Sequence, residues 1–217
     1  VLSKKKITNS EELPGALLQV VDKDGNVVEE WISTDKPHEI VAKLVVDESY
    51  VLREVRPADG WAYAEDVPFK VSHDGTVDYV KMEDKPTHVV ISKQEITGSK
   101  ELPGCTLQVI DKNGNVVDEW VSTDQPHEIK EKLIADEEYT LREVRPADGW
   151  AYAEDIPFKV SHDGTVDQVK MEDKPTHVVV SKKKITGKEE LPGCHLVIKD
   201  KNGNVDEWTS STTPHEI

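Results

Sequence analysis

The chain has 217 residues, a formal net charge of −16, and 36% hydrophobic against 32% charged residues. This length allows one or two domains that each bury a core. The 43 acidic against 27 basic side chains argue against a nucleic-acid partner, because phosphates would be repelled, and no run reaches the ~18–20 apolar residues of a membrane helix.

The sequence repeats with a period of 89 residues. The tetrapeptide ELPG at Glu12–Gly15 returns at Glu101–Gly104 and at Glu190–Gly193. Leu52–Val90 and Leu141–Val179 differ at only two of 39 positions. A period of this length fits a small independent domain better than a solenoid unit. We therefore expect two complete domains, residues 1–86 and 87–175, and the N-terminal part of a third, residues 176–217.

Short alternating runs separated by turn signals predict that each copy is all-β. The Asp-Gly turns at 23–26 and 73–76 predict hairpins, and no window of helical periodicity interrupts the pattern. The predicted strands of the first copy are Val1–Ile7, Ala16–Asp22, Asn26–Ser33, His38–Val45, Ser49–Val55, Val67–Ser72 and Thr76–Asp84. The fold class expected is therefore a row of β-sandwich domains with the third copy truncated.

Strand alternation places ionisable groups on apolar faces. Lys93 shares its face with Val89 and Ile91, because successive side chains point to opposite sides of a strand. By the same rule a glutamate shares the face of Leu52 and an aspartate that of Met82. The residues with inward parity are Lys4, Glu54 and Asp84 in the first copy, Lys93, Glu143 and Asp173 in the second, and Lys182 in the third.

Two interpretations of these inward charges stay open. One is structural: a buried salt-bridged cluster, or an error of parity that leaves one group at a sheet edge. The other is chemical. Desolvation lowers the pKa of an amine and raises that of a carboxyl group. A neutral lysine could then attack a protonated aspartic acid while a glutamate carries protons as general acid and base, and loss of water would leave an amide.

Three ordered motifs resemble CnaB-type (SpaA-like, prealbumin-like) domains of Gram-positive surface adhesins and pilins. The series from Ser92 to Cys105, containing ITG and ELPGC, is similar to their opening strand and loop. Residues 139–150 resemble their E-box, with Trp150 where tyrosine is usual, and residues 158–175 resemble their closing strands. The resemblance covers essentially the whole chain.

This resemblance implies a Greek-key β-sandwich and a spontaneous intramolecular isopeptide bond. Carried over by motif position, Lys4 would bond to Asp84 with Glu54 as catalyst. Lys93 would bond to Asp173 with Glu143 as catalyst. Aspartate stands where asparagine is commoner in the family, so the bond would release water rather than ammonia. Lys182 is the crosslinking lysine of the third copy, whose acidic partners lie outside these residues.

The other motifs predict structural roles. The eight histidines have no partners at a familiar metal-ligand spacing, so we expect no metal and no cofactor. Cys105 and Cys194 are too far apart in sequence and domain to pair, and Asp22–Asn26 fits a turn better than a calcium loop. We expect Trp31 and its counterparts Trp120 and Trp208 to pack in cores rather than form a ligand platform.

The function expected is the structural stalk of a cell-surface adhesin or pilin-like protein, outside the cell wall of a Gram-positive bacterium. The alternative is a binding module that grips a host protein or glycan directly. The sequence shows no motif of an open active site, so we do not expect an enzyme. The only reaction expected is a single-turnover crosslinking of the chain itself. The partners expected are further repeats of the same protein and a host molecule bound through a tip region outside these residues. We expect continuation of the chain, rather than a second chain, to complete the third copy.

Overall fold

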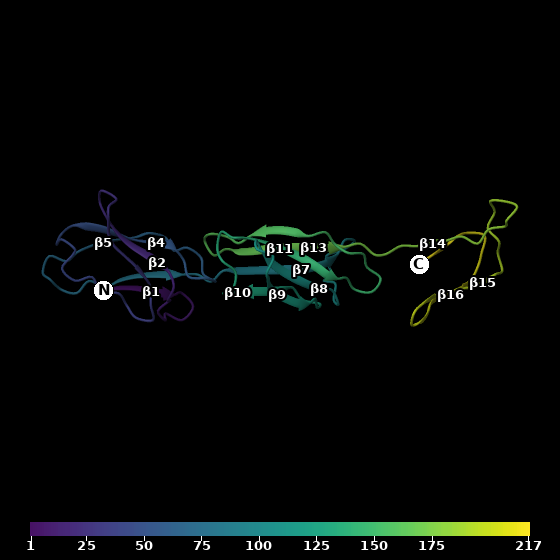
Figure 1. Ribbon diagram of the computed structural model, residues 1–217, viewed down its shortest axis with the longest axis horizontal. Coiled ribbons are helices and arrows are strands. Elements are labelled where there is room, and N and C mark those ends of the chain that lie inside the picture. Colours follow the sequence, from purple (N-terminus) through teal and green to yellow (C-terminus); the bar gives the residue numbers. More distant parts are fainter.

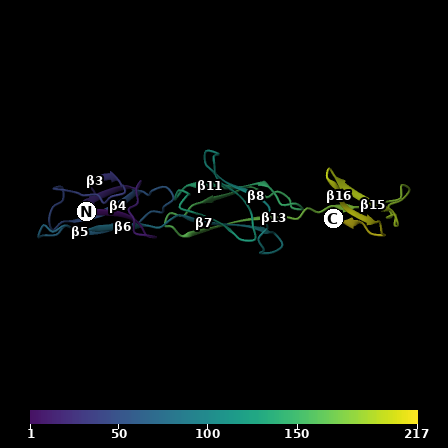
Figure 2. The same cartoon turned by 90° about the horizontal axis from the view of Figure 1, so that it is seen from below.

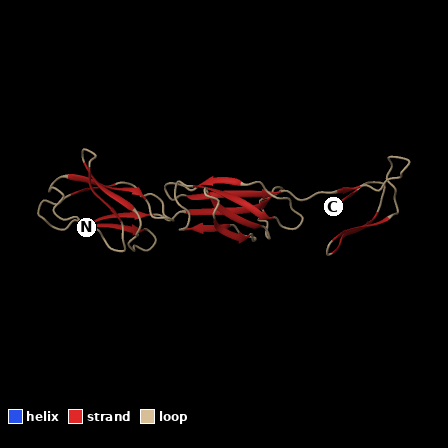
Figure 3. Cartoon of the chain, viewed as in Figure 1, coloured by secondary structure: helices blue, strands red, loops and turns tan.

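The computed structural model describes residues 1–217, which form strands and loops without a helix (Figure 3). No helix is therefore long and apolar enough to cross a membrane. Figure 1 shows three parts in a row along the long axis, and Figure 2 shows the same row after a quarter turn. We call them domain 1 (residues 1–86), domain 2 (87–175) and the C-terminal segment (176–217).

Domain 2 is a complete sandwich of two sheets. One sheet has three strands in the order β10-β7-β13 and the other has four in the order β12-β11-β8-β9. The first and last strands, β7 and β13, lie side by side and run parallel. The strands are β7 (His88–Glu95), β8 (Thr106–Asp111), β9 (Val116–Val121), β10 (His127–Lys130), β11 (Glu138–Arg145), β12 (Ile156–Lys159) and β13 (Val166–Asp173).

Domain 1 has the same order of strands with a smaller first sheet. Its four-stranded sheet, β3-β2-β4-β5, corresponds to that of domain 2, while the opposite sheet holds only the parallel pair β1-β6. The strands are β1 (Leu2–Lys6), β2 (Leu17–Asp22), β3 (Val27–Ile32), β4 (Ser49–Arg56), β5 (Val67–Lys70) and β6 (Val80–Asp84). The expected all-β sandwich class is confirmed.

The expected strand His38–Val45 is wrong in domain 1. Only His38 forms a bridge there, to Leu2. In domain 2 the corresponding strand β10 pairs with the segment from His88 to Ile91, and the counterparts of His88 and Val89 would precede Val1. Of the four residues that pair with β10, only Val90 and Ile91 therefore have counterparts in domain 1, which are Val1 and Leu2. The expected start of the last strand, Thr76, is also wrong, since β6 begins at Val80. In domain 2 the corresponding strand β13 begins at Val166, one residue after the counterpart of Thr76.

The two Asp-Gly turns have different roles. The turn at 23–26 joins the antiparallel neighbours β2 and β3, and the Asp22 carboxylate accepts hydrogen bonds from the N–H groups of Asp24 (2.9 Å) and Asn26 (2.8 Å). This is the expected hairpin, and the carboxylate is used by the turn itself. The turn at 73–76 is not a hairpin, because β5 and β6 belong to different sheets.

Each complete domain buries its own core between the two sheets. The core of domain 2 holds 13 buried apolar residues against seven in the main core of domain 1, and fully buried members include Leu107, Leu141 and Met171. The smaller core follows from the shorter first sheet. Trp31 and Trp120 pack partly buried against these cores and stack on His38 and His127.

The C-terminal segment forms two separate strand pairs rather than a sandwich. It contains β14 (Val179–Val180), β15 (His195–Asp200), β16 (Gly203–Thr209) and β17 (His215–Glu216), paired as β14-β17 and β15-β16. Val178 is 52% exposed, whereas its counterpart in domain 2, Val89, is fully buried. These residues therefore contain part of a domain without the strands that would cover its apolar side.

Candidate functional site

A lysine lies between two carboxylates in the interior of domain 1. Lys4 on β1, Glu54 on β4 and Asp84 on β6 are 2%, 7% and 0% exposed. Lys4 Nζ lies 2.6 Å from Glu54 Oε1 and donates a hydrogen bond to Asp84 Oδ1. Strand alternation predicts these inward orientations, because each group shares its face with an apolar residue two positions before it.

Domain 2 repeats the arrangement. Lys93 on β7, Glu143 on β11 and Asp173 on β13 are all buried. Lys93 Nζ lies 2.9 Å from Glu143 Oε1 and donates to Asp173 Oδ1. Two sandwiches of one chain therefore bring the same three residue types together from their first, middle and last strands.

A backbone group fixes each glutamate. The Ala64 N–H donates to Glu54 Oε2 at 2.8 Å, and the Ala153 N–H donates to Glu143 Oε2 at 2.9 Å. One carboxylate oxygen is thus held by the loop that follows the strand, which leaves Oε1 directed at the lysine. Sequence analysis missed these donors, since any residue carries an N–H and only the path of the loop selects one.

The ELPG motif holds the backbone of the lysine. Glu101 Oε2 accepts a hydrogen bond from the Lys93 N–H at 3.0 Å, and the Leu102 N–H donates to the Lys93 carbonyl oxygen at 2.6 Å. Domain 1 has the same pair through Glu12 and Leu13. We call this pair of contacts the ELPG clamp. The motif was noticed in the sequence as a repeat, but its contact with the lysine was not expected.

Burial dominates the electrostatics of the aspartates. It raises the pKa of Asp84 to about 7, with Glu54 adding to the rise and Lys4 opposing it. The pKa of Asp173 is also raised, again chiefly by burial and against the attraction of Lys93. One ammonium between two carboxylates would leave an unbalanced buried charge, so a proton on one carboxyl group is favoured.

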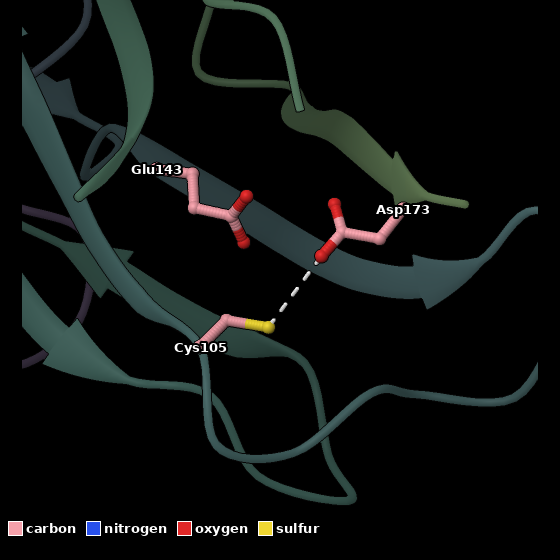
Figure 4. A group of neighbouring side chains, drawn as sticks. All are labelled: Cys105, Glu143 and Asp173. Carbon is pink, nitrogen blue, oxygen red and sulfur yellow. Dashed lines mark hydrogen bonds between the residues drawn. The ribbon is translucent and has the colours of Figure 1, made fainter. Parts of the chain in front are cut away.

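The two sites differ at one neighbouring residue. Cys105 Sγ lies 3.7 Å from Asp173 Oδ2 (Figure 4), while Ala16 occupies the corresponding position in domain 1 and Asp84 Oδ2 has no hydrogen-bond partner. Burial raises the pKa of the Cys105 thiol to about 11, so it stays protonated and can donate to the carboxylate.

The cluster of Cys105, Glu143 and Asp173 in Figure 4 has the residue types of a metal site, with ligand atoms within 4.8 Å of one another. However, Lys93 Nζ already contacts both carboxylates. A metal ion would have to displace this ammonium, and domain 1 lacks the sulfur. The donor set therefore fits the lysine better than a metal.

Lys182 is the one predicted site residue that the structure does not bring to a carboxylate side chain. Its side chain is exposed and forms no ion pair. The ELPG clamp is nevertheless present, because the Lys182 N–H donates to Glu190 Oε2 at 3.0 Å and the Leu191 N–H donates to the Lys182 carbonyl oxygen. The loop that carries the ELPG motif therefore holds the backbone of Lys182 although no glutamate or aspartate strand packs on its side chain.

The chain belongs to the family of SpaA prealbumin-like fold domains, whose model matches residues 1–86 and 87–175. Among solved structures, the Bacillus anthracis TIE protein is 17% identical, with a TM-score of 0.48, and the match covers 100% of this chain and 42% of that one. The chain therefore spans less than half the length of that protein.

Two pilus proteins of Lactobacillus rhamnosus GG are also similar. The shaft pilin SpaA is 13% identical with a TM-score of 0.38, and a C-terminal fragment of the pilus adhesin SpaC is 14% identical with a TM-score of 0.41. Each match covers 81% of this chain and 96% of the other. No curated protein matches the chain.

Proposed function

We propose that the chain is a structural stalk segment of a Gram-positive cell-surface adhesin or pilin-like protein, whose complete domains crosslink themselves. Lys4 bonds to Asp84 and Lys93 bonds to Asp173. The observation that carries the proposal is the repeated burial of one lysine against a glutamate and an aspartate on first, middle and last strands. Membership of the prealbumin-like family supports an extracellular, structural role.

The proposed reaction needs only groups in the chain. Glu54 takes a proton from the Lys4 ammonium, and the neutral amine then attacks Cγ of the protonated Asp84. A tetrahedral intermediate forms. Glu54 returns this proton to the departing hydroxyl group and accepts the second proton that the nitrogen loses, the C–O bond breaks, and water leaves. The product is an amide between Nζ and Cγ. The positive charge of Lys4 and the negative charge of Glu54 both disappear, which removes much of the cost of burying them. Glu143 has the same role in domain 2.

The raised aspartate pKa favours this chemistry. A carboxylate resists attack because it already carries negative charge, whereas a carboxylic acid can accept the amine and lose water. Burial raises the pKa of Asp84 to about 7, so a substantial share of the acid is protonated at neutral pH. The reaction occurs once per domain and has no external substrate, so the domains are not enzymes in the usual sense.

Intact mass spectrometry of the folded chain tests the proposal. We expect the mass to be lower than that of the sequence by two water molecules. Lys4→Arg and Lys93→Arg should each restore one water, because the guanidinium is not a nucleophile at neutral pH. Lys182→Arg is the matched control and should leave two waters missing. Peptide mapping should then find Lys4 joined to Asp84 and Lys93 joined to Asp173.

Replacing Glu54 tests its role as the catalyst while Lys4 and Asp84 stay in place. Glu54→Gln should restore one water while retaining the side-chain shape and its contact with the Ala64 N–H. A full, unmodified mass for the folded wild-type chain would overturn the crosslinking proposal. A folded Glu54→Gln variant that still lacks two waters would leave the bonds in place but remove Glu54 as the catalyst.

A further inference from the structure

The two complete domains meet through specific contacts at their junction. Tyr63, in the loop between β4 and β5, stacks on His162, in the loop between β12 and β13. Their ring centroids are 4.1 Å apart and the planes differ by 12°. The Tyr63 N–H also donates to the His162 carbonyl oxygen at 3.0 Å. Side chain and backbone of one residue are thus both engaged by the neighbouring domain.

Thr87 connects the same two domains at the linker. Its hydroxyl group lies within hydrogen-bonding distance of the carbonyl oxygens of Gly60 (3.0 Å) and Leu133 (2.8 Å). Its own carbonyl oxygen accepts from the Glu131 N–H at 3.1 Å. Thr87 is buried, so its hydroxyl and carbonyl groups have no access to water and need these hydrogen-bond partners from the two domains.

Two glycines allow the domains to approach closely. A Cβ on Gly60 would overlap the Glu131 carbonyl group, and one on Gly164 would lie 2.8 Å from Lys85 Cβ. The corresponding glycines at the outer ends, Gly149 and Gly75, have nothing within 4 Å of the same position. All four have positive φ, so what differs between the pairs is the neighbouring domain.

The contacts define two complementary surfaces. The donor face consists of Gly60, Tyr63 and Lys85 of domain 1 together with the linker residue Thr87. The acceptor face of domain 2 consists of Glu131, Leu133, His162 and Gly164. Domain 2 carries an identical donor face, because the repeat is unchanged at all four positions. That second face has no partner: Gly149 and Thr176 are exposed and Tyr152 is 67% exposed.

We propose that the donor and acceptor faces form a standard joint between successive domains, and that the free donor face of domain 2 docks the acceptor face of another copy of the domain. We choose another copy of the domain as the partner because the junction between domains 1 and 2 already shows an identical donor face bound to this acceptor face. The joint keeps adjacent domains in one relative orientation. It rests on contacts outside the lysine sites and holds whether or not the crosslinks form.

Paired variants in the existing chain test the first part. Residual dipolar couplings of wild-type domains 1 and 2 should fit one common alignment tensor. Gly60→Ala and Tyr63→Ala should give each domain its own tensor and faster independent tumbling. Gly149→Ala and Tyr152→Ala introduce the same backbone strain and the same loss of a ring, without a facing domain, and should keep the common tensor. Separate alignment tensors for domains 1 and 2 in the wild type would contradict the proposed joint. Equal effects of the variants at the junction and of the control variants would contradict it as well.

The second part needs a third complete domain. In a chain where a further copy of residues 87–175 replaces residues 176–217, all three domains should share one tensor. Tyr152→Ala should now release the third domain alone, as Tyr63→Ala releases the first. A third domain that tumbles freely while domains 1 and 2 stay coupled would show that the donor face of domain 2 is not a docking surface. Intact mass measured on the same samples keeps this result distinct from the state of the crosslinks.

Discussion

At the scale of single residues, the environment of the aspartate determines what the lysine can do. Lys4 alone against Asp84 would be an ordinary buried ion pair. Glu54 adds a second negative group, and its Oε2 is held by a backbone N–H. Burial is the main cause of the raised pKa of Asp84, Lys4 opposes the rise, and the charge of Glu54 adds to it. The same three groups thereby favour proton transfer and disfavour a stable ion pair.

The raised pKa of Asp84 predicts an unusual dependence of stability on pH. In a Glu54→Gln chain domain 1 stays uncrosslinked, and burial still raises the pKa of Asp84. The folded state then binds more protons than the unfolded state from pH about 4 up to the raised pKa that Asp84 has in this variant. The free energy of unfolding of domain 1 should therefore be highest near pH 4 and fall as the pH rises through that pKa, measured by urea denaturation at several pH values.

The control for that measurement is the double variant Glu54→Gln/Asp84→Asn. Its asparagine does not titrate, so the fall in stability between pH 4 and 7 should disappear. Surface aspartates with lowered pKa values, such as Asp22 and Asp47, act below this window and with the opposite sign. A slope that persists in the double variant would assign the effect to other groups.

At the scale of structural elements, a loop and a strand cooperate at each lysine. The ELPG clamp binds both polar backbone groups of Lys93 and thereby fixes the end of β7 opposite β13. The clamp exists in all three copies, including the C-terminal segment that has no sandwich. The backbone of the lysine is thus held by the adjacent loop, while the proposed reaction would also need the middle and last strands.

The clamp predicts a slower crosslink when its acid is removed. Glu101→Ala should leave the Lys93 N–H unpaired, cost about 1 kcal/mol of domain 2 stability, and slow water loss from domain 2 in a time course of refolding followed by mass spectrometry. Glu101→Gln keeps an acceptor oxygen and should restore the rate. Glu190→Ala, in the copy without acidic partners, should change neither bond. An unchanged rate in Glu101→Ala would limit the clamp to a structural role.

Sequence alone predicted the elements that depend on alternation. The inward direction of Lys4, Glu54 and Asp84 follows from the period of two in a strand, because each lies two positions after a Leu or Met that faces the core. Features that depend on long-range pairing were less accessible. The segment from His38 to Val45 forms only the bridge between His38 and Leu2, and the turn at 73–76 changes sheets because β6 pairs with β1. The N–H donors to the glutamates depend on loop paths that no residue type signals.

At the scale of the whole molecule, the bonds determine where tension would travel. The lysine lies on the first strand of each domain and the aspartate at the end of the last, and these strands are parallel neighbours. Tension applied at the two ends of the row enters a domain at its first strand and leaves after its last. With the bonds formed, this path passes through an amide from Lys93 to Asp173 and bypasses the chain between them.

This path predicts the extension of the chain under force. Without the bond, unfolding of domain 2 would release the 80 residue steps from Lys93 to Asp173. At about 3.6 Å per residue this is roughly 290 Å of added contour, less the distance between the two ends in the folded domain. Single-molecule pulling of a Lys93→Arg chain should show one such step, while the wild type should show none for either domain.

Lys182→Arg provides the control for the pulling experiment, since its side chain has no carboxylate partner here and its trace should match the wild type. The Lys4→Arg trace should show a step of the same length from domain 1, because Lys4 and Asp84 are also separated by 80 positions. That step should occur at lower force than the Lys93→Arg step, since the main core of domain 1 has seven buried residues against 13. A full-length step in wild-type molecules whose mass lacks two waters would contradict the proposed force path, because a closed covalent loop cannot be extended.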